Sequence, residues 1–286
     1  AYSNAPVCAV ARSTILNGVH AVTQGTQHMR SRHRIPANFE SYVSYLRAQG
    51  YYCTNNSKTD YNFKGDDAAI WDDCSQKADY KSCPADKPFF AIFNLTVSHE
   101  SSLFPKNIED RRKRGMIPKS LRLDPAKLQV PPYLPDLPEI RSDIAIYHDQ
   151  ITLLDKQVGK LLDELAERGR ADDTIVIYYS DHGGILPRGK RYLMDTGVRV
   201  PMIVRVPKKW LSYAPFKPGQ RIDEIVSFVD LAPTILSLAG MDKPAQMQGR
   251  AFLGPKRMES EKDAAVFLYA DRFDEIYGMR RGITDG

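Results

Sequence analysis

The sequence lacks the features that mark several classes of protein. None of its apolar runs approaches the ~18 residues of a membrane-spanning helix, so no membrane partner is expected. The net charge of +5 over 286 residues is small. The basic segment 28–34 has no interleaved aromatic residues and matches no known nucleic-acid-binding fold, so no nucleic-acid partner is expected. Neither repeats nor linkers divide the chain, and 42% hydrophobic residues predict one sizeable core.

Cysteine is scarce, with residues only at positions 8, 53, 74 and 83. Cys74 and Cys83 lie in a polar loop, where they could form a local disulfide of the kind found in exported proteins. Two free thiols are the alternative. Cys53 is expected to be buried in a strand, so Cys8 is the cysteine for which we consider chemistry.

An acid and an imidazole follow a buried strand in the second half of the chain. The apolar run at 174–179 predicts the strand, and Ser-Asp-His-Gly-Gly follows at 180–184. Open α/β sheets build their sites at the carboxyl ends of strands. Asp181 and His182 are therefore candidates for metal binding or acid–base chemistry, and Lys190 is a candidate cation for an anionic substrate. An ordinary strand end with a solvated turn is the alternative.

A second candidate site lies near the first residue. Residues 9–16 are good helix formers, and Asn17 and Gly18 are a typical C-terminal cap. Cys8 then lies at the helix N-terminus, where backbone N–H groups and the helix dipole favour an anion. Arg12 lies one turn later on the same face. A small buried thiol beside a surface arginine is the alternative.

Taken in order, these motifs resemble those of the sulfatase family in the alkaline-phosphatase-like superfamily. Residues 4–18 resemble the family signature Cys-x-Pro/Ala-x-Arg, with Val10 at the third position, where the family has Pro or Ala. Residues 180–190 resemble the family's Asp-His-Gly and Gly-Lys motifs. The resemblance implies that Cys8 is oxidised to formylglycine, whose hydrate is the nucleophile.

The resemblance also implies the metal site and part of the anion site. It predicts that one divalent cation, Ca²⁺, is bound by Asp181, His182 and the modified Cys8. It predicts that Lys190 contacts the sulfate group of the substrate.

Two further segments extend the resemblance. Residues 39–62 follow the family order of helix, Gly-Tyr, strand and Lys-x-His, so Lys58 is expected to contact the nucleophile. Asp60 stands where the family has the histidine that orients the nucleophile. Residues 88–100 resemble the family's Pro-Phe-Phe strand, which we expect to run from 88 to 97 and to end near His99, the residue that corresponds to a histidine contacting the sulfate ester.

The function implied by the resemblance is hydrolysis of sulfate esters or sulfamates on a sulfated carbohydrate. Arg12, Lys58 and Lys190 are expected to hold the sulfate oxygens and the nucleophile, and His99 is expected to protonate the leaving atom. A formylglycine-generating or anaerobic maturating enzyme is the expected partner, and the expected location is the periplasm or the cell exterior. Within the family, the chain resembles the bacterial sulfatases related to heparan N-sulfatase.

Two alternatives keep the same fold. A phosphoester or phosphonate hydrolase of the same superfamily would use a similar site, although its nucleophile is mostly Ser or Thr where this chain has Cys8. The other alternative is a catalytically inactive, sulfatase-like protein that binds sulfated glycans. Val10 and Asp60 favour it, because both depart from the family pattern.

The expected fold is α/β, with a mostly parallel central sheet and helices on both faces, as in the large domain of sulfatases. Strands are expected at 51–55, 88–97, 173–179, 200–206 and 225–229. Helices are expected at 9–17, 38–49, 140–168 and 230–239. The long helix is expected to bury a stripe that includes Ile144, Tyr147, Ile151, Leu154, Val158, Leu161 and Leu165.

The ends of the chain suggest a fragment that is truncated at both ends. The family begins with a strand ending in Asp-Asp, and only seven residues precede Cys8. We therefore expect residues 1–276 to be a catalytic domain without its first strand. Residues 277–286 are expected to begin a truncated C-terminal subdomain. With part of the metal site missing, residues 1–286 alone are expected to be inactive.

Overall fold

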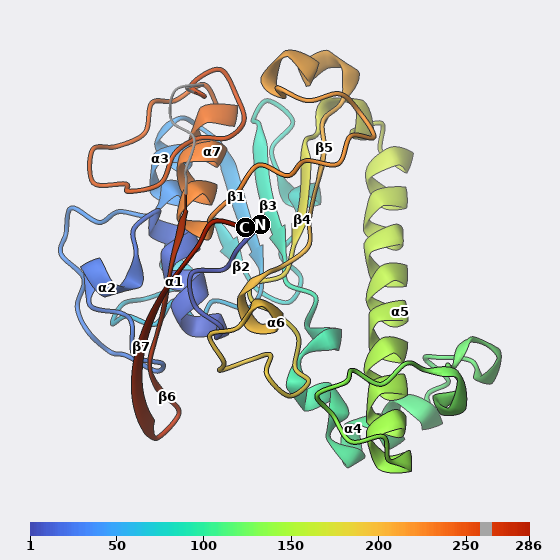
Figure 1. Cartoon of the computed structure of the whole chain (residues 1–286). Coiled ribbons are helices and arrows are strands. Elements are labelled where there is room, and N and C mark those ends of the chain that lie inside the picture. The colour runs from blue at the N-terminus through green and yellow to red at the C-terminus, as the bar shows by residue number, and fades with distance from the viewer. Residues whose placement is uncertain (258–264) are drawn as a thin grey trace. The chain divides into compact units, whose positions relative to one another are not determined.

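The computed structural model describes residues 1–257 and 265–286 (Figure 1). The chain forms two compact units. Unit 1 comprises 1–94, 173–184 and 188–286, and unit 2 comprises 95–172 and 185–187.

A short parallel sheet lies in unit 1. Its strands are β1 (Tyr52–Asn56), β2 (Asp73–Cys74) and β3 (Phe89–Phe93), in the order β2-β1-β3. The register pairs Tyr52 with Phe89 and Asn56 with Phe93. Because β1 and β3 run in the same direction, their carboxyl ends reach the same edge of the sheet.

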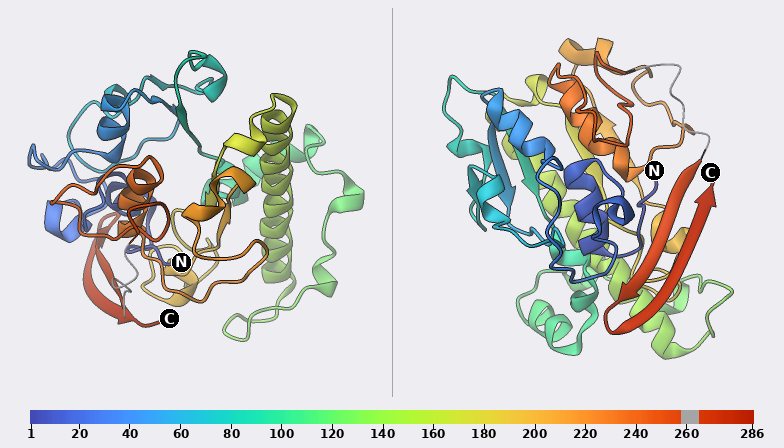
Figure 2. Two further views of the ribbon diagram at one scale, coloured as in Figure 1. Left: turned by 90° about the horizontal axis from the view of Figure 1, so that it is seen from above. Right: turned by 90° about the vertical axis from the view of Figure 1, so that its left-hand side faces the viewer.

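Two antiparallel pairs complete the strands of unit 1. Strand β4 (Val176–Tyr179) pairs with β5 (Met202–Arg205), and β6 (Val266–Phe273) pairs with β7 (Ile276–Thr284) (Figure 2). The prediction of a strand at 225–229 was wrong. In this segment Ser227 forms a single bridge to Tyr2, and the chain then turns into a 3₁₀ helix. The start of β7 falls at the expected domain boundary, and that division stays a prediction.

Helices cover part of this framework in unit 1. They are α1 (Cys8–Asn17), α2 (Ala21–Gln24), α3 (Tyr42–Ala48), α6 (Asp195–Val198) and α7 (Leu231–Leu238). Helices α1, α3 and α7 contact one another, and α3 also packs on β1. Their core is one cluster of almost fully buried side chains, which includes Leu16, Tyr42, Leu46, Cys53 and Leu236. The helices expected in these regions are confirmed, and Gly18 caps α1 with a φ of 62°.

Unit 2 is built on α4 (Pro105–Lys113) and the 30-residue helix α5 (Pro138–Glu167). The core of this unit joins Leu153 and Leu154 of α5 to Val97 and Ile117. The expected apolar stripe is only partly confirmed, because Ile151 is 40% exposed. The buried face of α5 carries Asp149 and Gln150 as well.

Short 3₁₀ helices connect these elements. They are η1 (Ala68–Ile70), η2 (Tyr80–Ser82), η3 (Thr96–Ser98), η4 (Glu100–Leu103), η5 (Lys119–Leu121), η6 (Pro125–Lys127), η7 (Ala171–Asp173), η8 (Lys208–Tyr213) and η9 (Phe228–Asp230).

The structure also describes the state of the cysteines and the length of the helices. None of the four cysteines forms a disulfide, so the disulfide considered between Cys74 and Cys83 is wrong. In the described ranges, no helix combines the length and the apolar character that crossing a membrane requires. The α/β fold class itself is confirmed.

Candidate active site

Cys8 is the first residue of α1, as the sequence predicted. The preceding residue, Val7, is extended, and no side chain caps this end of the helix. The first backbone N–H groups of a helix have no acceptors within the helix, and here no capping side chain supplies one. Cys8 is only 4% exposed. The arrangement places a small side chain at a point where a helix N-terminus favours negative charge.

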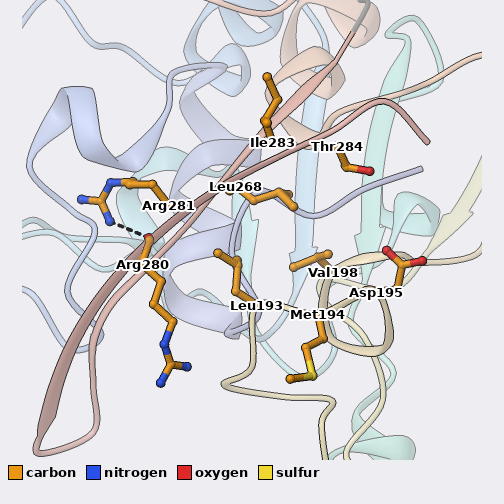
Figure 3. Close-up of a pocket in the computed structure, with 10 residues that line it drawn as sticks. Leu193, Met194, Asp195, Val198, Leu268, Arg280, Arg281, Ile283 and Thr284 are labelled. Atoms are coloured by element: carbon orange, nitrogen blue, oxygen red, sulfur yellow. Dashed lines mark hydrogen bonds between the residues drawn. The ribbon is translucent and has the colours of Figure 1, made fainter.

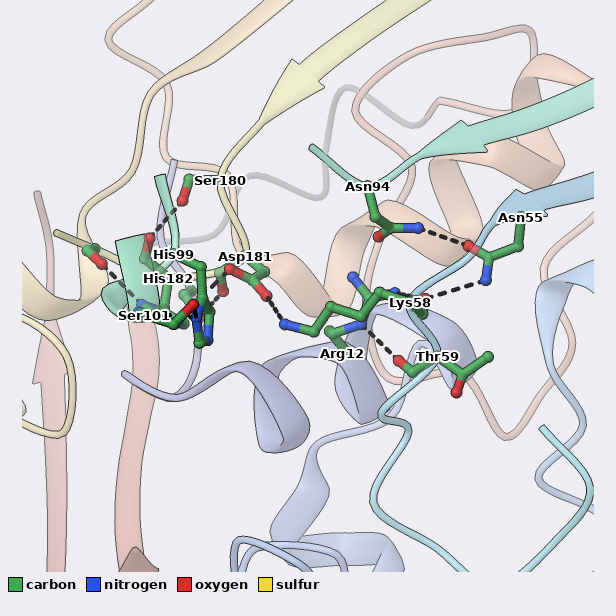
Figure 4. A network of polar contacts seen from close by, with 12 residues as sticks. Arg12, Asn55, Lys58, Thr59, Asn94, His99, Ser101, Ser180, Asp181 and His182 are labelled. Atoms are coloured by element: carbon green, nitrogen blue, oxygen red, sulfur yellow. Dashed lines mark hydrogen bonds and ion pairs between the residues drawn. The ribbon is translucent and has the colours of Figure 1, made fainter. Parts of the chain in front are cut away.

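Arg12 ties this helix to the loop that carries Lys58 (Figure 4). Its Nε donates to the carbonyl oxygen of Thr59 at 2.7 Å, and its Nη2 donates to that of Lys58 at 2.5 Å. Its guanidinium carbon lies 5.6 Å from the centroid of the Tyr61 ring. Arg12 thus fixes the backbone on which Lys58 stands.

Lys58 and Asp181 meet in an ion pair, with Nζ and Oδ2 3.6 Å apart (Figure 4). Burial disfavours the charged form of Asp181, but nearby positive charges outweigh it and hold the pKa of its carboxyl below the ordinary value. His182 lowers this pKa most when it is protonated, and Lys58, Arg12 and Lys190 lower it as well. Asp181 is therefore a carboxylate at neutral pH.

His182 follows Asp181 and is oriented by its own loop. Its Nδ1 donates to the carbonyl oxygen of Gly183 at 2.8 Å, so the lone pair of the neutral ring is on Nε2. That Nε2 lies 3.8 Å from Oδ1 of Asp181. Burial lowers the pKa of His182, and the Asp181 charge opposes this only in part. A neutral imidazole with Nε2 beside a carboxylate is the form that binds a metal ion.

Glycine is required where this loop meets the next one. Gly183 donates its N–H to the carbonyl oxygen of Gly197 at 2.8 Å. A Cβ at residue 183 would lie 2.1 Å from the carbonyl oxygen of Thr196, far inside any real contact. The Asp-His-Gly-Gly sequence therefore lets backbone pack directly on backbone, and this contact fixes the direction in which Asp181 and His182 leave the loop.

Lys190 lies on the following loop and is 6% exposed. Its backbone N–H donates to the carbonyl oxygen of Gly184 at 2.7 Å. The next residue, Arg191, donates its backbone N–H to the carbonyl oxygen of Pro6 at 2.8 Å. The Lys190 loop is therefore bonded both to the Asp-His-Gly-Gly loop and to the segment that leads into Cys8.

His99 is the one predicted site residue in unit 2. Strand β3 ends at Phe93, so the strand expected to run to 97 was too long, and His99 instead follows the 3₁₀ helix η3. Its Nδ1 accepts a hydrogen bond from the backbone N–H of Ser101 at 3.3 Å. This bond places the proton of the neutral ring on Nε2. The other predicted residues, Cys8, Arg12, Lys58, Asp181, His182 and Lys190, all lie in unit 1.

The donors for the predicted metal ion fit a divalent cation in kind. Asp181 supplies a carboxylate oxygen and His182 a neutral nitrogen. In the part of the chain that the structure describes, no group of three or more His, Cys, Asp or Glu side chains is placed to hold a metal ion. Ligation by Asp181, His182 and Cys8 therefore stays a prediction.

Two asparagines that the sequence analysis did not assign complete the polar network. Asn55, which is fully buried, donates from Nδ2 to the carbonyl oxygen of Lys58 at 3.1 Å. Asn94 donates from Nδ2 to Oδ1 of Asn55 at 2.8 Å (Figure 4). Both lie at the carboxyl ends of parallel strands, β1 and β3. Their position after two strands was the feature from which their place in the site could have been predicted.

A hollow of about 470 Å³ lies elsewhere in unit 1 (Figure 3). It is lined by residues of the 193–198 segment, including Leu193 and Met194, and by the β6–β7 hairpin, including Arg280 and Arg281. None of the predicted site residues lines it.

The fold of this chain is also found in solved structures. One is described as a complex with its substrate D-glucosamine-2-N,6-O-disulfate; it has a TM-score of 0.72 and 16% identity over 99% of this chain and 78% of that chain. At this identity the likeness shows the fold alone.

The sulfatase family model matches residues 52–241, more than half of the chain. The chain belongs to the sulfatase family. An ulvan-active sulfatase of Formosa agariphila is 36% identical over 322 residues, which cover 99% of this chain and 52% of that protein. The human N-sulphoglucosamine sulphohydrolase is 34% identical over 125 residues, which cover 43% of this chain and 23% of that protein. The chain thus spans about half the length of the Formosa relative.

Proposed function

We propose that the protein carrying this chain hydrolyses sulfate esters or sulfamates on a sulfated carbohydrate. Membership of the sulfatase family supports the class of reaction. The names of two relatives, one ulvan-active and one a hydrolase of N-sulphoglucosamine, support the class of substrate.

The observation that carries the proposal is a buried cysteine at a helix N-terminus, beside Lys58. Burial raises the pKa of the Cys8 thiol, Lys58 lowers it, and Asp60 and Asp181 raise it further, so the net direction is upward. A thiol that stays protonated at neutral pH is a poor nucleophile. The unmodified thiol is therefore inert, which favours the formylglycine that this family uses. The helix N-terminus and Lys58 are the features that suit an anionic substrate.

The remaining residues divide the work of binding and proton transfer. Arg12, Lys58 and Lys190 neutralise the sulfate oxygens at the helix N-terminus. Formylglycine formed from Cys8 supplies the nucleophile in the matured protein. A divalent cation, Ca²⁺ in our proposal, would be held by Asp181, His182 and residue 8 and would supply further positive charge for the anion.

His99 is proposed as the acid for the leaving atom. Its Nδ1 is occupied by the Ser101 backbone, and the ring proton is therefore on Nε2. A ring fixed in this way can donate from one defined atom.

Maturation and location follow from the same chemistry. Cys8 must be oxidised by a formylglycine-generating or anaerobic maturating enzyme, which is the protein partner that we propose. We place the protein in the periplasm or outside the cell, where a polymeric carbohydrate is encountered.

The test combines two measurements on the full-length protein. Mass spectrometry of the tryptic peptide that ends at Arg12 should show the loss of mass expected when the Cys8 thiol becomes an aldehyde. Release of inorganic sulfate from sulfated carbohydrates should exceed release of phosphate from matched phosphate esters. Phosphate release that exceeds sulfate release would instead identify a phosphoester hydrolase.

A second candidate is a sulfatase-like protein that binds sulfated glycans without turnover. It is favoured by Val10 and Asp60, which depart from the family pattern. An unmodified Cys8 in a protein that binds sulfated carbohydrate without releasing sulfate would establish this candidate.

A further inference from the structure

The first acidic residue of the chain is Glu40, and a cluster of arginines precedes it. Arg30, Arg32 and Arg34 occupy alternate positions, and all three side chains are exposed. Among residues 1–257 and 265–286, no ion pair and no side-chain hydrogen bond is found for these three. An exposed guanidinium that is not paired within the protein is available to an anion from solution.

The segment that carries these arginines is bonded to the loop that carries Lys58. Asn62, on that loop, donates from Nδ2 to the carbonyl oxygens of Thr26 and His28, both at 2.7 Å. Its Oδ1 accepts a hydrogen bond from the backbone N–H of Ser31 at 2.9 Å. The Asn62 side chain is buried, so water competes little for these bonds. One amide therefore fixes the backbone of the arginine segment relative to the Lys58 loop.

The same segment also packs beside Cys8. Met29 is 4% exposed and lies in the core cluster that contains Val7 and Cys8. Its backbone N–H donates to the carbonyl oxygen of Arg272 at 2.9 Å. Arg30 follows directly with a φ of 60°, in the left-handed region that few residues other than glycine adopt. The chain thus leaves the Cys8 cluster at Met29, and the next side chain is exposed.

A lysine adds a fourth cation to the three arginines. Lys64 donates its backbone N–H to the carbonyl oxygen of His33 at 2.9 Å. Its side chain is exposed and forms no ion pair within the described part of the chain. Asp66, the next acid along the chain, accepts a hydrogen bond from the backbone N–H of Ala68 and is engaged with its own turn. We call the four cations the basic patch: Arg30, Arg32, Arg34 and Lys64.

We propose that the basic patch binds sulfate groups of the carbohydrate chain that neighbour the group being hydrolysed. The proposal rests on the proposed function, which brings a sulfated carbohydrate to Cys8. A sulfated polymer presents several anions in a row, and a guanidinium offers two parallel N–H groups to an oxyanion. A nucleic acid fits the patch less well, because no aromatic side chains alternate with the arginines to stack on its bases.

The test measures binding of the full-length protein to dextran sulfate, a sulfated polysaccharide, with unsulfated dextran as the reference. The patch variant combines four substitutions: Arg30→Gln, Arg32→Gln, Arg34→Gln and Lys64→Gln. Its Kd for dextran sulfate should rise about tenfold, because each exposed charge contact is weak but four act together. The rise should shrink as salt is added, since salt screens exposed charges. The melting temperature should change little, because all four side chains are exposed.

A control variant removes four exposed cations from β5 and the segment that follows it: Arg205→Gln, Lys208→Gln, Lys217→Gln and Arg221→Gln. Strand β5 ends at Arg205, which pairs with Val176 at the start of β4, whereas Asp181 follows the end of β4. The control variant has the same net charge as the patch variant. Its Kd for dextran sulfate should equal that of the wild type.

The outcomes separate the two proposals. Equal affinity of the patch variant and the wild type for dextran sulfate would overturn the role of the patch, whether or not the wild type releases sulfate. Equal weakening in both variants would overturn it too, because net charge alone would then explain the binding. Tighter binding of the wild type to double-stranded DNA than to dextran sulfate would identify a nucleic-acid surface instead. Patch-dependent binding in a protein that releases no sulfate would overturn the proposed function and keep the patch as a site for sulfated carbohydrate.

Discussion

At the scale of the residue, Arg12 joins the stability of the fold to the geometry of the site. Its fork of N–H groups satisfies two backbone carbonyls at once, those of Lys58 and Thr59. Lysine has one ammonium group and cannot reproduce that fork. We therefore expect Arg12→Lys to lower the free energy of unfolding by about 1–3 kcal/mol and to lower kcat/KM.

Urea denaturation and steady-state kinetics measure the two effects. Arg47→Lys is the control, because Arg47 makes the same kind of clamp on Asp72 and on the carbonyl oxygens of Ala69 and Ile70, all of which lie apart from the site. It should lose stability and keep its kinetics. Full activity in Arg12→Lys would show that the Lys58 loop needs no such clamp.

His99 provides a test at the same scale that depends on the substrate. A sugar alkoxide is a poor leaving group and needs a proton, whereas a phenolate needs it less. His99→Ala should therefore cost about 10²–10⁴-fold in kcat/KM for sugar sulfates and much less for aryl sulfates. Equal losses for both substrates would leave His99, at most, a binding residue.

At the scale of the element, the ends of β1 and β3 are joined by Asn55 and Asn94. Asn55→Ala would leave the Lys58 carbonyl with one donor fewer and the Asn94 amide without its acceptor on Asn55. The Lys58 carbonyl keeps the Arg12 donor and the Asn94 amide keeps the carbonyl oxygen of Asn56, so each lost hydrogen bond is expected to cost about 0.5–1.5 kcal/mol, together with a lower kcat.

Asn56→Ala is the matched control for Asn55. It removes a neighbouring amide whose Nδ2 donates to the carbonyl oxygens of Gln76 and Ala78, away from Lys58. Thermal unfolding should show a loss of stability in both variants. A fall in kcat for Asn56→Ala as large as that for Asn55→Ala would contradict the role given to the strand-end network.

Local patterns predicted the helices well and the strands less well. The run of helix formers before Asn17 and Gly18 predicted α1, because the signal for its end lies within the sequence itself. The apolar run 225–229 was expected to be a strand, since a short apolar run reads alike in strands and helix starts. Ser227 and Asp230 instead form a capping box that opens a helical turn.

The pairings in the site could not be predicted from spacing. Lys58 and Asp181 are far apart in the sequence, and only the folded chain brings their charges to 3.6 Å. The same holds for Asn55 and Asn94, whose contact depends on the register of two parallel strands. Because sites form at the carboxyl ends of strands, the sequence predicted where polar residues would lie. It did not predict which of them would contact one another.

At the scale of the whole molecule, the metal ion is expected to link stability to activity. A ligand that binds only the folded state raises its stability. We expect a chelator to lower both the melting temperature and the sulfatase activity of the full-length protein, and Ca²⁺ to restore both. Asp181→Asn should abolish the response of the melting temperature to Ca²⁺. A melting temperature that does not change with the chelator would contradict the metal site.

The most direct test of the central claim is the release of inorganic sulfate from a sulfated carbohydrate by the full-length protein and by its Cys8→Ala variant. In our proposal the variant loses the nucleophile but keeps Arg12, Lys58 and Lys190, the side chains that we propose for binding the anion. We predict that the wild type releases sulfate, and that Cys8→Ala releases none while it still folds and binds the substrate. Sulfate release by Cys8→Ala at the rate of the wild type would contradict the account.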